Sequence, residues 1–317
     1  MKVKYLVTGA GGFIGSGLVK RLLDSGAHKV YALDNFSYSD GARLRAISDR
    51  RLVIIEEDLK SPAKLPAVLK DTDLVFHLAA NPDVRSSSVE TEVHFSDNLF
   101  ATYRLLEEMR KTGSSDIVFT SSSTVYGERK GSAKEDDPCF PISVYGGMKL
   151  ASENLIATYV GSGFLGSGAV LRLANIVGGS STHGVVYDFV QKLRRNPCEL
   201  EILGDGKQTK SYLHINDTLD ALELVGARIS QRSGVYDVYN VGSEDTITVD
   251  EIARTVAGMM GLNPKVKYLN TFAGRGWIGD VTYFHLDTQK LKSLGWSPKH
   301  NSRSSVEFTV SELLARN

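Results

Sequence analysis

A tyrosine and a lysine, Tyr145 and Lys149, stand four positions apart in a segment that favours a helix. Residues at this spacing lie on one helical face, one turn from each other. A free tyrosine has a pKa near about 10 and is a poor base at neutral pH. A nearby ammonium group favours the phenolate. The pair can therefore supply a general base that removes a proton from a hydroxyl group.

A run of hydroxyl residues, Thr120 to Thr124, follows an apolar segment earlier in the chain. A serine hydroxyl at a strand end can bridge between a substrate oxygen and the tyrosine. The Tyr-x-x-x-Lys spacing is common by chance, and taken alone it describes an ordinary surface pair on a helix. Its order in this chain, after a serine-rich strand end and a glycine loop, makes chance improbable.

The glycine loop lies at the N-terminus, where an apolar strand runs into Gly9, Gly12 and Gly15. Glycines let the backbone turn tightly and approach a pyrophosphate, and the helix that opens at Phe13 and Ile14 directs N–H groups towards it. The spacing is Gly-x-x-Gly-x-x-Gly, because Ile14 occupies the third glycine position of the common dehydrogenase fingerprint. A tight strand-to-helix turn without a ligand is the alternative interpretation.

An acidic residue, Asp34, ends the second predicted strand and is followed by Asn35. A carboxylate at this position accepts hydrogen bonds from the adenosine ribose and repels a 2′-phosphate, which favours NAD over NADP. The alternative is that Asp34 only caps the next turn.

The third and fourth predicted strands end in residues that suit the rest of the dinucleotide. We expect the third strand end to contact the adenine and the small residues after the fourth to leave room for the cofactor; these residues are Asp58, Leu59, Leu78, Ala79 and Ala80. His77 is expected to be packed or hydrogen-bonded rather than catalytic. No His, Cys and Asp residues have metal-ligand spacing, so we predict no metal.

Short apolar runs alternate with helical patterns through the first half of the chain. The predicted strands are Lys4–Thr8, Lys29–Leu33, Leu52–Glu56, Leu74–Leu78, Asp116–Thr120 and Ala169–Leu173, and the predicted helices include Phe13–Leu23, Asn98–Met109 and Tyr145–Tyr159. This alternation predicts an α/β fold, a Rossmann-type doubly wound parallel sheet covered by helices.

The second half is more irregular, with further helical patterns at Val185–Leu193, Asn216–Ala227 and Val249–Met260. We predict a NAD-binding domain over 1–175, to which a later segment at about 208–245 returns. A smaller α/β lobe over 176–317 is predicted to bind the substrate.

The 317 residues are 42% hydrophobic and carry 37 basic and 37 acidic side chains. The balanced charge gives no indication of a nucleic-acid or membrane partner. No secretory signal and no apolar run of about 18 residues is apparent. The two cysteines, Cys139 and Cys198, do not suggest a disulfide framework, so we expect a cytoplasmic protein.

With these motifs the chain resembles the extended short-chain dehydrogenase/reductases that act on nucleotide sugars, and most closely the UDP-glucose 4-epimerases. The resemblance covers nearly the whole chain. Beyond the features above it is carried by Asn98, Leu171-Arg172-Leu173-Ala174-Asn175, Gly204-Asp205-Gly206-Lys207-Gln208, Tyr239-Asn240-Val241-Gly242, Arg275-Gly276-Trp277-Ile278-Gly279-Asp280-Val281 and Leu294-Gly295-Trp296.

The resemblance implies roles for individual residues. Ser122, Tyr145 and Lys149 match the catalytic positions, and Asn98 matches a cofactor contact. The implied substrate-binding residues are Ser122, Asn175, Lys210, Arg275, Asp280 and Phe284. The implied assembly is a homodimer formed through the helices at 98–109 and 145–159.

Within that set, Asn175 would contact the sugar diphosphate, Arg275 would bind the pyrophosphate, and Phe284 would face the C2 substituent of the sugar. Lys210 stands where an arginine is usual. Leu173-Ala174 replaces an aromatic pair common beside the nicotinamide, and Met148 replaces a frequent serine.

The reaction is predicted from the two positions after Ser122. Related sugar dehydratases carry an Asp-Glu pair there, whereas this chain has Ser123 and Thr124. We therefore predict an isomerase that interconverts UDP-galactose and UDP-glucose through a transient 4-keto sugar, with NAD as a bound prosthetic group. The alternatives are a UDP-glucuronate 4-epimerase or a sugar dehydratase and, from another class, a non-catalytic NAD-binding regulator.

Overall fold

The structure is a computed structural model that describes residues 3–113, 116–269 and 272–316. The chain divides into two compact units. Unit 1 comprises Met1–Ser122, Gly147–Arg172 and Leu219–Tyr239, and unit 2 comprises Ser123–Gly146, Leu173–Thr218 and Asn240–Asn317. The chain thus passes between the units several times, and each unit is described by itself.

A seven-stranded sheet runs through unit 1 in the order β11-β6-β5-β4-β1-β2-β3. Its strands are β1 Lys4–Thr8, β2 Lys29–Asp34, β3 Leu52–Glu56, β4 Leu74–His77, β5 Asp116–Ser122, β6 Ser167–Leu173 and β11 Tyr236–Val241. The pairings β1–β2, β2–β3, β1–β4 and β4–β5 are all parallel. The strand order reverses between β1 and β4, and in open sheets of this kind ligands bind at the carboxyl ends beside such a reversal.

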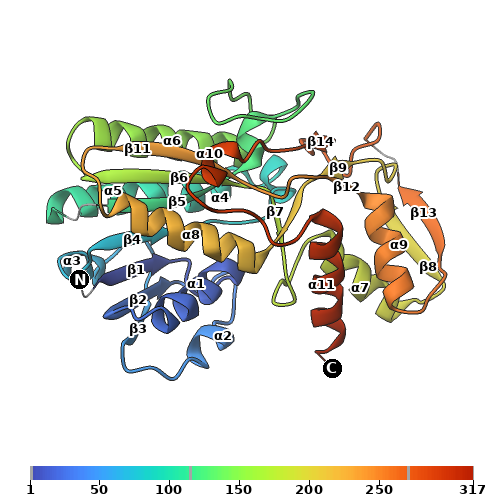
Figure 1. Ribbon diagram of the computed structural model, residues 1–317, viewed down its shortest axis with the longest axis horizontal. Helices are drawn as coiled ribbons and strands as arrows, with labels where there is room; N and C mark the ends of the chain where they lie inside the picture. Colours follow the sequence, from blue (N-terminus) through green and yellow to red (C-terminus); the bar gives the residue numbers. More distant parts are fainter. Residues whose placement is uncertain (1–2, 114–115, 270–271, 317) are drawn as a thin grey trace. The chain divides into compact units, whose positions relative to one another are not determined.

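Helices cover the sheet (Figure 1). The long helices of unit 1 are α1 Phe13–Asp24, α5 Ala101–Thr112, α6 Val144–Gly161 and α8 Ile215–Ile229, and the short ones are α2 Ala42–Arg45 and α3 Leu65–Leu69. Helices α1 and α8 lie side by side, since Arg21 bonds Asp220 at 2.6 Å. The predicted doubly wound Rossmann-type fold is confirmed.

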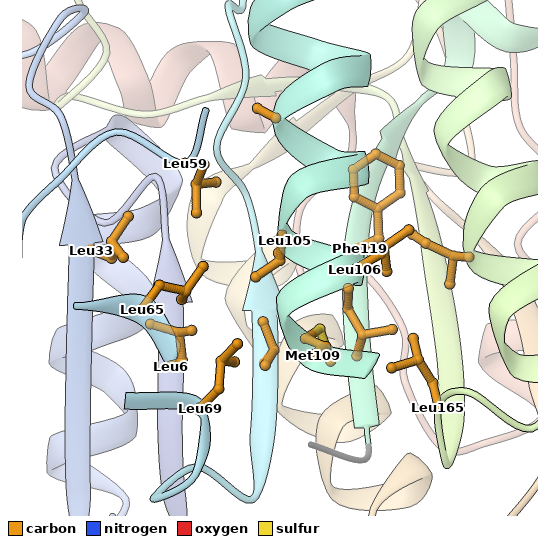
Figure 2. Packing of buried hydrophobic residues seen from close by; sticks show 14 of the residues in the cluster. Leu6, Leu33, Leu59, Leu65, Leu69, Leu105, Leu106, Met109, Phe119 and Leu165 are labelled. Atoms are coloured by element: carbon orange, nitrogen blue, oxygen red, sulfur yellow. The ribbon is translucent and has the colours of Figure 1, made fainter. Parts of the chain in front are cut away.

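Apolar residues of α3, α5 and α6 form one core with the strands (Figure 2). Leu105, Leu106 and Met109 of α5 pack with Phe119 of β5 and with Leu165. Their spacing along α5 gives the helix a single apolar face, which explains why this segment forms a helix that lies on the sheet.

The helix predicted at 98–109 is longer and less regular than expected. Helix α4 Thr91–His94 continues through a π-helical turn, η2 Phe95–Phe100, into α5. Asn98 therefore lies inside the helix rather than at its start. Its Oδ1 accepts a hydrogen bond from the Asn81 backbone N–H at 2.7 Å, and its amide lies 3.3 Å from His94 Nδ1. Such single π turns are frequent at functional sites, and apolar periodicity gives no signal for them.

Unit 2 contains three small sheets and a separate core. The sheets pair β7 Asn175–Val177 with β10 Tyr212–His214, β8 Glu199–Leu203 with β13 Lys265–Leu269, and β9 Thr209–Lys210 with both β12 Ile247–Thr248 and β14 Tyr283–Phe284. Helices α7 Val185–Arg195, α9 Val249–Met259 and α11 Ser302–Leu314 supply most of the core residues. Unit 2 also contains α10 Gln289–Lys292 and the short turn η3 Ser123–Tyr126, whereas the short turn η1 Ser86–Ser88 belongs to unit 1.

The expected division of the chain differs from these units in three places. Residues 123–146 and residues 173–175, both placed in the first domain on sequence, group with unit 2. The returning segment is 219–239 rather than about 208–245, because only α8 and most of β11 pack with the large sheet. Among the described residues, no helix has the length and apolar character needed to cross a membrane.

We predict that Leu105→Ala lowers the free energy of unfolding by about 2–5 kcal/mol, because it removes a fully buried side chain and leaves a cavity. Chemical denaturation with circular dichroism measures this. Met259→Ala, at a position 38% exposed on α9, is the control and should cost less than about 1 kcal/mol. Equal losses for the two variants would contradict the packing described here.

Candidate active site

Gly9 brings the end of β1 against the end of β4. Its φ is +67°, a conformation that favours glycine, and a Cβ there would lie 2.6 Å from the Ala79 backbone nitrogen. The expected cofactor residues Gly9, Leu78 and Ala79 therefore lie together at the point where the strand order reverses.

Gly15 lets the first turn of α1 approach the loop. A Cβ at Gly15 would lie 2.1 Å from the Gly9 carbonyl oxygen, so no side chain fits without moving backbone. Gly12 is the residue before the helix and provides no side-chain cap for the first N–H groups of α1. Uncapped N–H groups and the positive end of the helix dipole form a site for a phosphate.

Asp34 connects the end of β2 to the glycine loop. Its Oδ2 accepts from the Gly11 backbone N–H at 2.8 Å, and its Oδ1 accepts from the Phe36 N–H at 2.7 Å. The carboxylate is thus fixed in direction, and each oxygen retains a second lone pair with which to accept a hydroxyl. Asn35 beside it donates to Asp58 at 3.1 Å, which brings two further expected cofactor residues together.

The side chain of Leu59 is buried in the hydrophobic core of unit 1. The predicted contact of Leu59 with the cofactor stays a prediction, and it would use the backbone of this residue. Phe13, Ile14 and Ala80 are each partly exposed.

Tyr145 and Lys149 both lie on α6, one turn apart, as the spacing predicted. The Lys149 side chain is only 3% exposed. Its Nζ donates to the Thr120 carbonyl oxygen at the end of β5 at 2.9 Å and lies 4.7 Å from the centre of the Phe119 ring. Burial lowers the pKa of Lys149 to about 8, and the negative charge of Glu153 opposes that shift. The amine therefore keeps its positive charge at neutral pH.

His77 is packed and hydrogen-bonded, as expected. Its ring nitrogens lie 2.8 Å from Thr8 Oγ1 and 2.9 Å from Thr102 Oγ1, and the ring stacks on Phe119. Burial, helped by the charge of Lys149, lowers the pKa of His77 to about 3. His77 is therefore neutral and adds no second positive charge beside Lys149.

The serines at the end of β5 point to different sides. Ser121 is buried, and its Oγ donates to Glu153 on α6. Successive side chains of a strand alternate between its faces, so Ser122 points away from that contact. Ser122 is partly exposed, which suits the substrate-facing hydroxyl that the sequence assigned to it.

In unit 2 the expected substrate residues Lys210, Arg275 and Asp280 form one polar cluster. Lys210 Nζ bonds Asp280 Oδ1 at 2.5 Å and lies 5.3 Å from the centre of the Trp277 ring. Arg275 contacts the Asp280 carbonyl oxygen at 3.3 Å and Glu128 at 3.2 Å. Both cations are therefore held in place by carboxylates.

Phe284 and Asn175 complete the expected substrate set. Phe284 is 3% exposed and lies opposite Lys210 in the pairing of β14 with β9. The Asn175 side-chain amide donates to the Ser211 carbonyl oxygen at 3.1 Å.

Comparison with known proteins identifies the family. Residues 5–242 match the model of the NAD dependent epimerase/dehydratase family. The chain belongs to this family. It is therefore an NAD-dependent enzyme of the epimerase type within the extended short-chain dehydrogenase/reductases, as the sequence predicted.

Individual relatives are similar to this chain over almost its whole length. A UDP-glucose 4-epimerase of Mycolicibacterium smegmatis is 30% identical over 318 residues, which cover 97% of each chain. A crystal structure of a UDP-galactose 4-epimerase is 39% identical with a TM-score of 0.87, covering 99% of each chain. A UDP-glucuronic acid 4-epimerase from Bacillus cereus, solved with UDP-glucuronic acid and NAD, is 26% identical with a TM-score of 0.88, covering 99% of this chain and 100% of that one.

The geometry of unit 1 fits the NAD of this epimerase/dehydratase family. The cradle at Gly9 and Gly15, which a Cβ would fill, suits the pyrophosphate, and Asp34 suits the adenosine ribose. That Lys149 holds the nicotinamide ribose and tunes Tyr145 stays a prediction.

Two buried charged residues, Glu153 and Arg172, lie near Lys149. The sequence motifs did not indicate a role for either of them. Arg172 Nη2 bonds Glu153 Oε2 at 2.7 Å, and both side chains are almost fully buried. The available signal was a charged residue within an otherwise apolar strand, Ser167–Leu173.

We predict that Gly15→Ala reduces the NAD retained after purification by roughly tenfold or more, because the new Cβ would displace the Gly9 carbonyl from the cradle. Denaturing the protein and assaying the released NAD measures this. The control is Gly258→Ala on α9, where a Cβ meets nothing within 4 Å and NAD content should not change. Full NAD content in Gly15→Ala would contradict this assignment of the loop.

Proposed function

We propose that this enzyme interconverts UDP-galactose and UDP-glucose by inverting the C4 hydroxyl through a transient 4-keto sugar. The observation that carries the proposal is the buried, charged amine of Lys149 at the end of β5, one helical turn from Tyr145. Tyr145 and Lys149 supply a base for a hydroxyl group. The two positions after Ser122 lack the acids that an elimination needs.

In this proposal Tyr145 removes the proton of the 4-hydroxyl. The positive charge of Lys149 lowers the cost of forming the phenolate and thereby makes tyrosine a usable base near neutral pH. Ser122 bridges the sugar oxygen and the phenol. Bound NAD supplies reversible hydride chemistry at C4, and a cycle that begins and ends in the same oxidation state favours a cofactor that stays bound.

The two residues after Ser122 argue against dehydration. Ser123 and Thr124 form the start of the η3 turn and have no acid or base function at neutral pH. A dehydratase must remove a C5 proton and protonate a leaving C6 hydroxyl. A site without a carboxyl at either position is better suited to oxidation and reduction at C4.

We propose that Arg275 and Lys210 bind the diphosphate of the substrate, and that Asn175, also in unit 2, contributes to this site. The pair between Arg275 and Glu128 is partly exposed and therefore weak, so an incoming diphosphate can replace the carboxylate. Lys210 is more strongly held by the buried Asp280. An ammonium has three N–H donors, so Lys210 can keep that contact and still bind a phosphate oxygen.

We also propose that the enzyme works in the cytoplasm as a homodimer. Exposed aromatic residues along the helix at 91–112, Phe95, Phe100 and Tyr103, support a second copy as the partner. The sequence contains only two cysteines, Cys139 and Cys198, which is consistent with a reducing compartment. A sedimentation mass of one 34.6 kDa chain would contradict the dimer.

We predict that the purified protein converts UDP-galactose to UDP-glucose without added NAD, as followed by proton NMR. Tyr145→Phe should reduce turnover by at least about a hundredfold while retaining bound NAD, because only the base is removed. UDP-glucuronate tests the alternative substrate in the same assay. Conversion of UDP-glucuronate but not of UDP-galactose would show that UDP-glucuronate is the substrate instead. Full activity of Tyr145→Phe would contradict the mechanism.

We predict a preference for UDP-glucose and UDP-galactose over their N-acetylated forms, because the bulky, buried Phe284 leaves little room beside the C2 substituent. Phe284→Ser should raise kcat/KM for UDP-N-acetylglucosamine relative to UDP-glucose by roughly tenfold or more. The comparison uses both substrates with each protein. An unchanged ratio would show that Phe284 only packs in the core of unit 2.

A further inference from the structure

A buried ion pair joins α6 to β6 beside the proposed catalytic lysine. Glu153 on α6 is 2% exposed and Arg172 on β6 is 5% exposed. The Arg172 Nε atom lies 3.2 Å and 3.1 Å from the two carboxylate oxygens of Glu153, and Nη2 lies 2.7 Å from Oε2. This fork of two guanidinium nitrogens on one carboxylate fixes the relative orientation of the two side chains as well as their distance.

This ion pair also reaches β5. Ser121 Oγ donates to Glu153, while Lys149, one turn earlier on α6, donates to the carbonyl oxygen of Thr120. Two consecutive residues of β5 are thus tied to two successive turns of the same helix. The proposed catalytic Ser122 is the next residue along the strand.

Stability alone is a poor explanation for the pair. Burying two charges removes them from water, and replacing a buried ion pair by well-packed apolar residues is often neutral or stabilising. The pair instead sets the register of α6 against the end of β5, where a small displacement would move Lys149 relative to Thr120.

We propose that Glu153 and Arg172 are positioning residues for the catalytic pair: acting through Ser121, their ion pair holds the end of β5 against α6 and so fixes where the Lys149 amine lies. The inference rests on the catalytic role proposed above for Lys149. The Glu153 carboxylate further helps Lys149 to stay protonated in its buried position.

The first test compares Glu153→Gln with the unaltered, NAD-bound enzyme across pH. Losing the anion lowers the pKa of Lys149, so the fall in kcat at alkaline pH should begin about one pH unit earlier, roughly a fivefold loss near pH 8, with KM nearly unchanged. Glu201→Gln is the control, since Glu201 on β8 forms a partly exposed ion pair with Lys192 at 3.5 Å within unit 2, and its pH profile should not move.

A second set of variants separates positioning from stability. Arg172→Lys keeps the charge without the fork and should recover part of the kcat that Arg172→Met loses. The double variant Glu153→Leu/Arg172→Met should regain Tm by apolar packing but keep the low kcat and the shifted pH profile. If kcat returns together with Tm in the double variant, the pair is only structural and the proposal is overturned.

A measurement independent of turnover distinguishes failure of this inference from failure of the proposed function. Carbon-13 NMR of protein labelled at the lysine ε-carbons follows the titration of Lys149, assigned with Lys149→Arg. The Lys149 resonance should titrate at lower pH in Glu153→Gln, even if UDP-galactose proves not to be the substrate. Superimposable Lys149 titrations in Glu153→Gln and the unaltered protein would overturn the proposal.

Discussion

The buried amine of Lys149 is the constraint on which the rest of the site depends. A charged group in the protein interior loses its hydration, and the surrounding residues must offset that cost. Here the Thr120 carbonyl accepts a hydrogen bond from the amine, the face of Phe119 lies beside it, and the carboxylate of Glu153 contributes opposite charge. His77 remains neutral, which avoids repulsion. Because the amine belongs to α6 and its acceptor to β5, satisfying it also fixes the helix against the sheet.

The glycine loop imposes a second constraint of a different kind, which is steric. Gly9 must approach the backbone of Ala79, and Gly15 must approach Gly9, so both positions exclude side chains. Asp34 then holds the loop through the Gly11 N–H. The loop, Asp34 and Lys149 all lie at the carboxyl ends of strands in one parallel sheet. The residues expected to bind NAD therefore come from several strand ends of this sheet.

Much of the fold and part of the site could be predicted from the sequence. The strands β1 and β3 have the predicted bounds, and the other four predicted strands differ by only one or two residues at an end, because apolar runs bounded by turn residues are a strong local signal. Tyr145, Lys149 and the glycine loop were found by their spacing. The later strands β7 to β14 were not predicted, and most of them have only two or three residues, which is too few to show a periodicity.

Other features depend on tertiary contacts that a single sequence does not display. The side chain of Asn98, within the π turn, bonds Asn81, which lies in another segment. The Glu153–Arg172 pair requires that α6 and β6 be placed side by side. The burial of the Leu59 side chain in the core of unit 1 likewise depends on contacts with distant segments. Helix α11 was also missed, although Asn301 provides its N-cap by accepting from the Ser304 N–H at 2.8 Å.

The central claim is that hydrogen leaves and returns to the same carbon, C4 of the sugar, within one site. The most direct test uses UDP-galactose labelled with deuterium at C4 in ordinary water, together with unlabelled UDP-galactose in deuterated water. The account predicts that UDP-glucose keeps the deuterium at C4 in the first experiment and gains none at any carbon in the second. Transfer of the label from C4 to C6, or deuterium at C5 from the solvent, would contradict C4 epimerisation and indicate elimination chemistry instead.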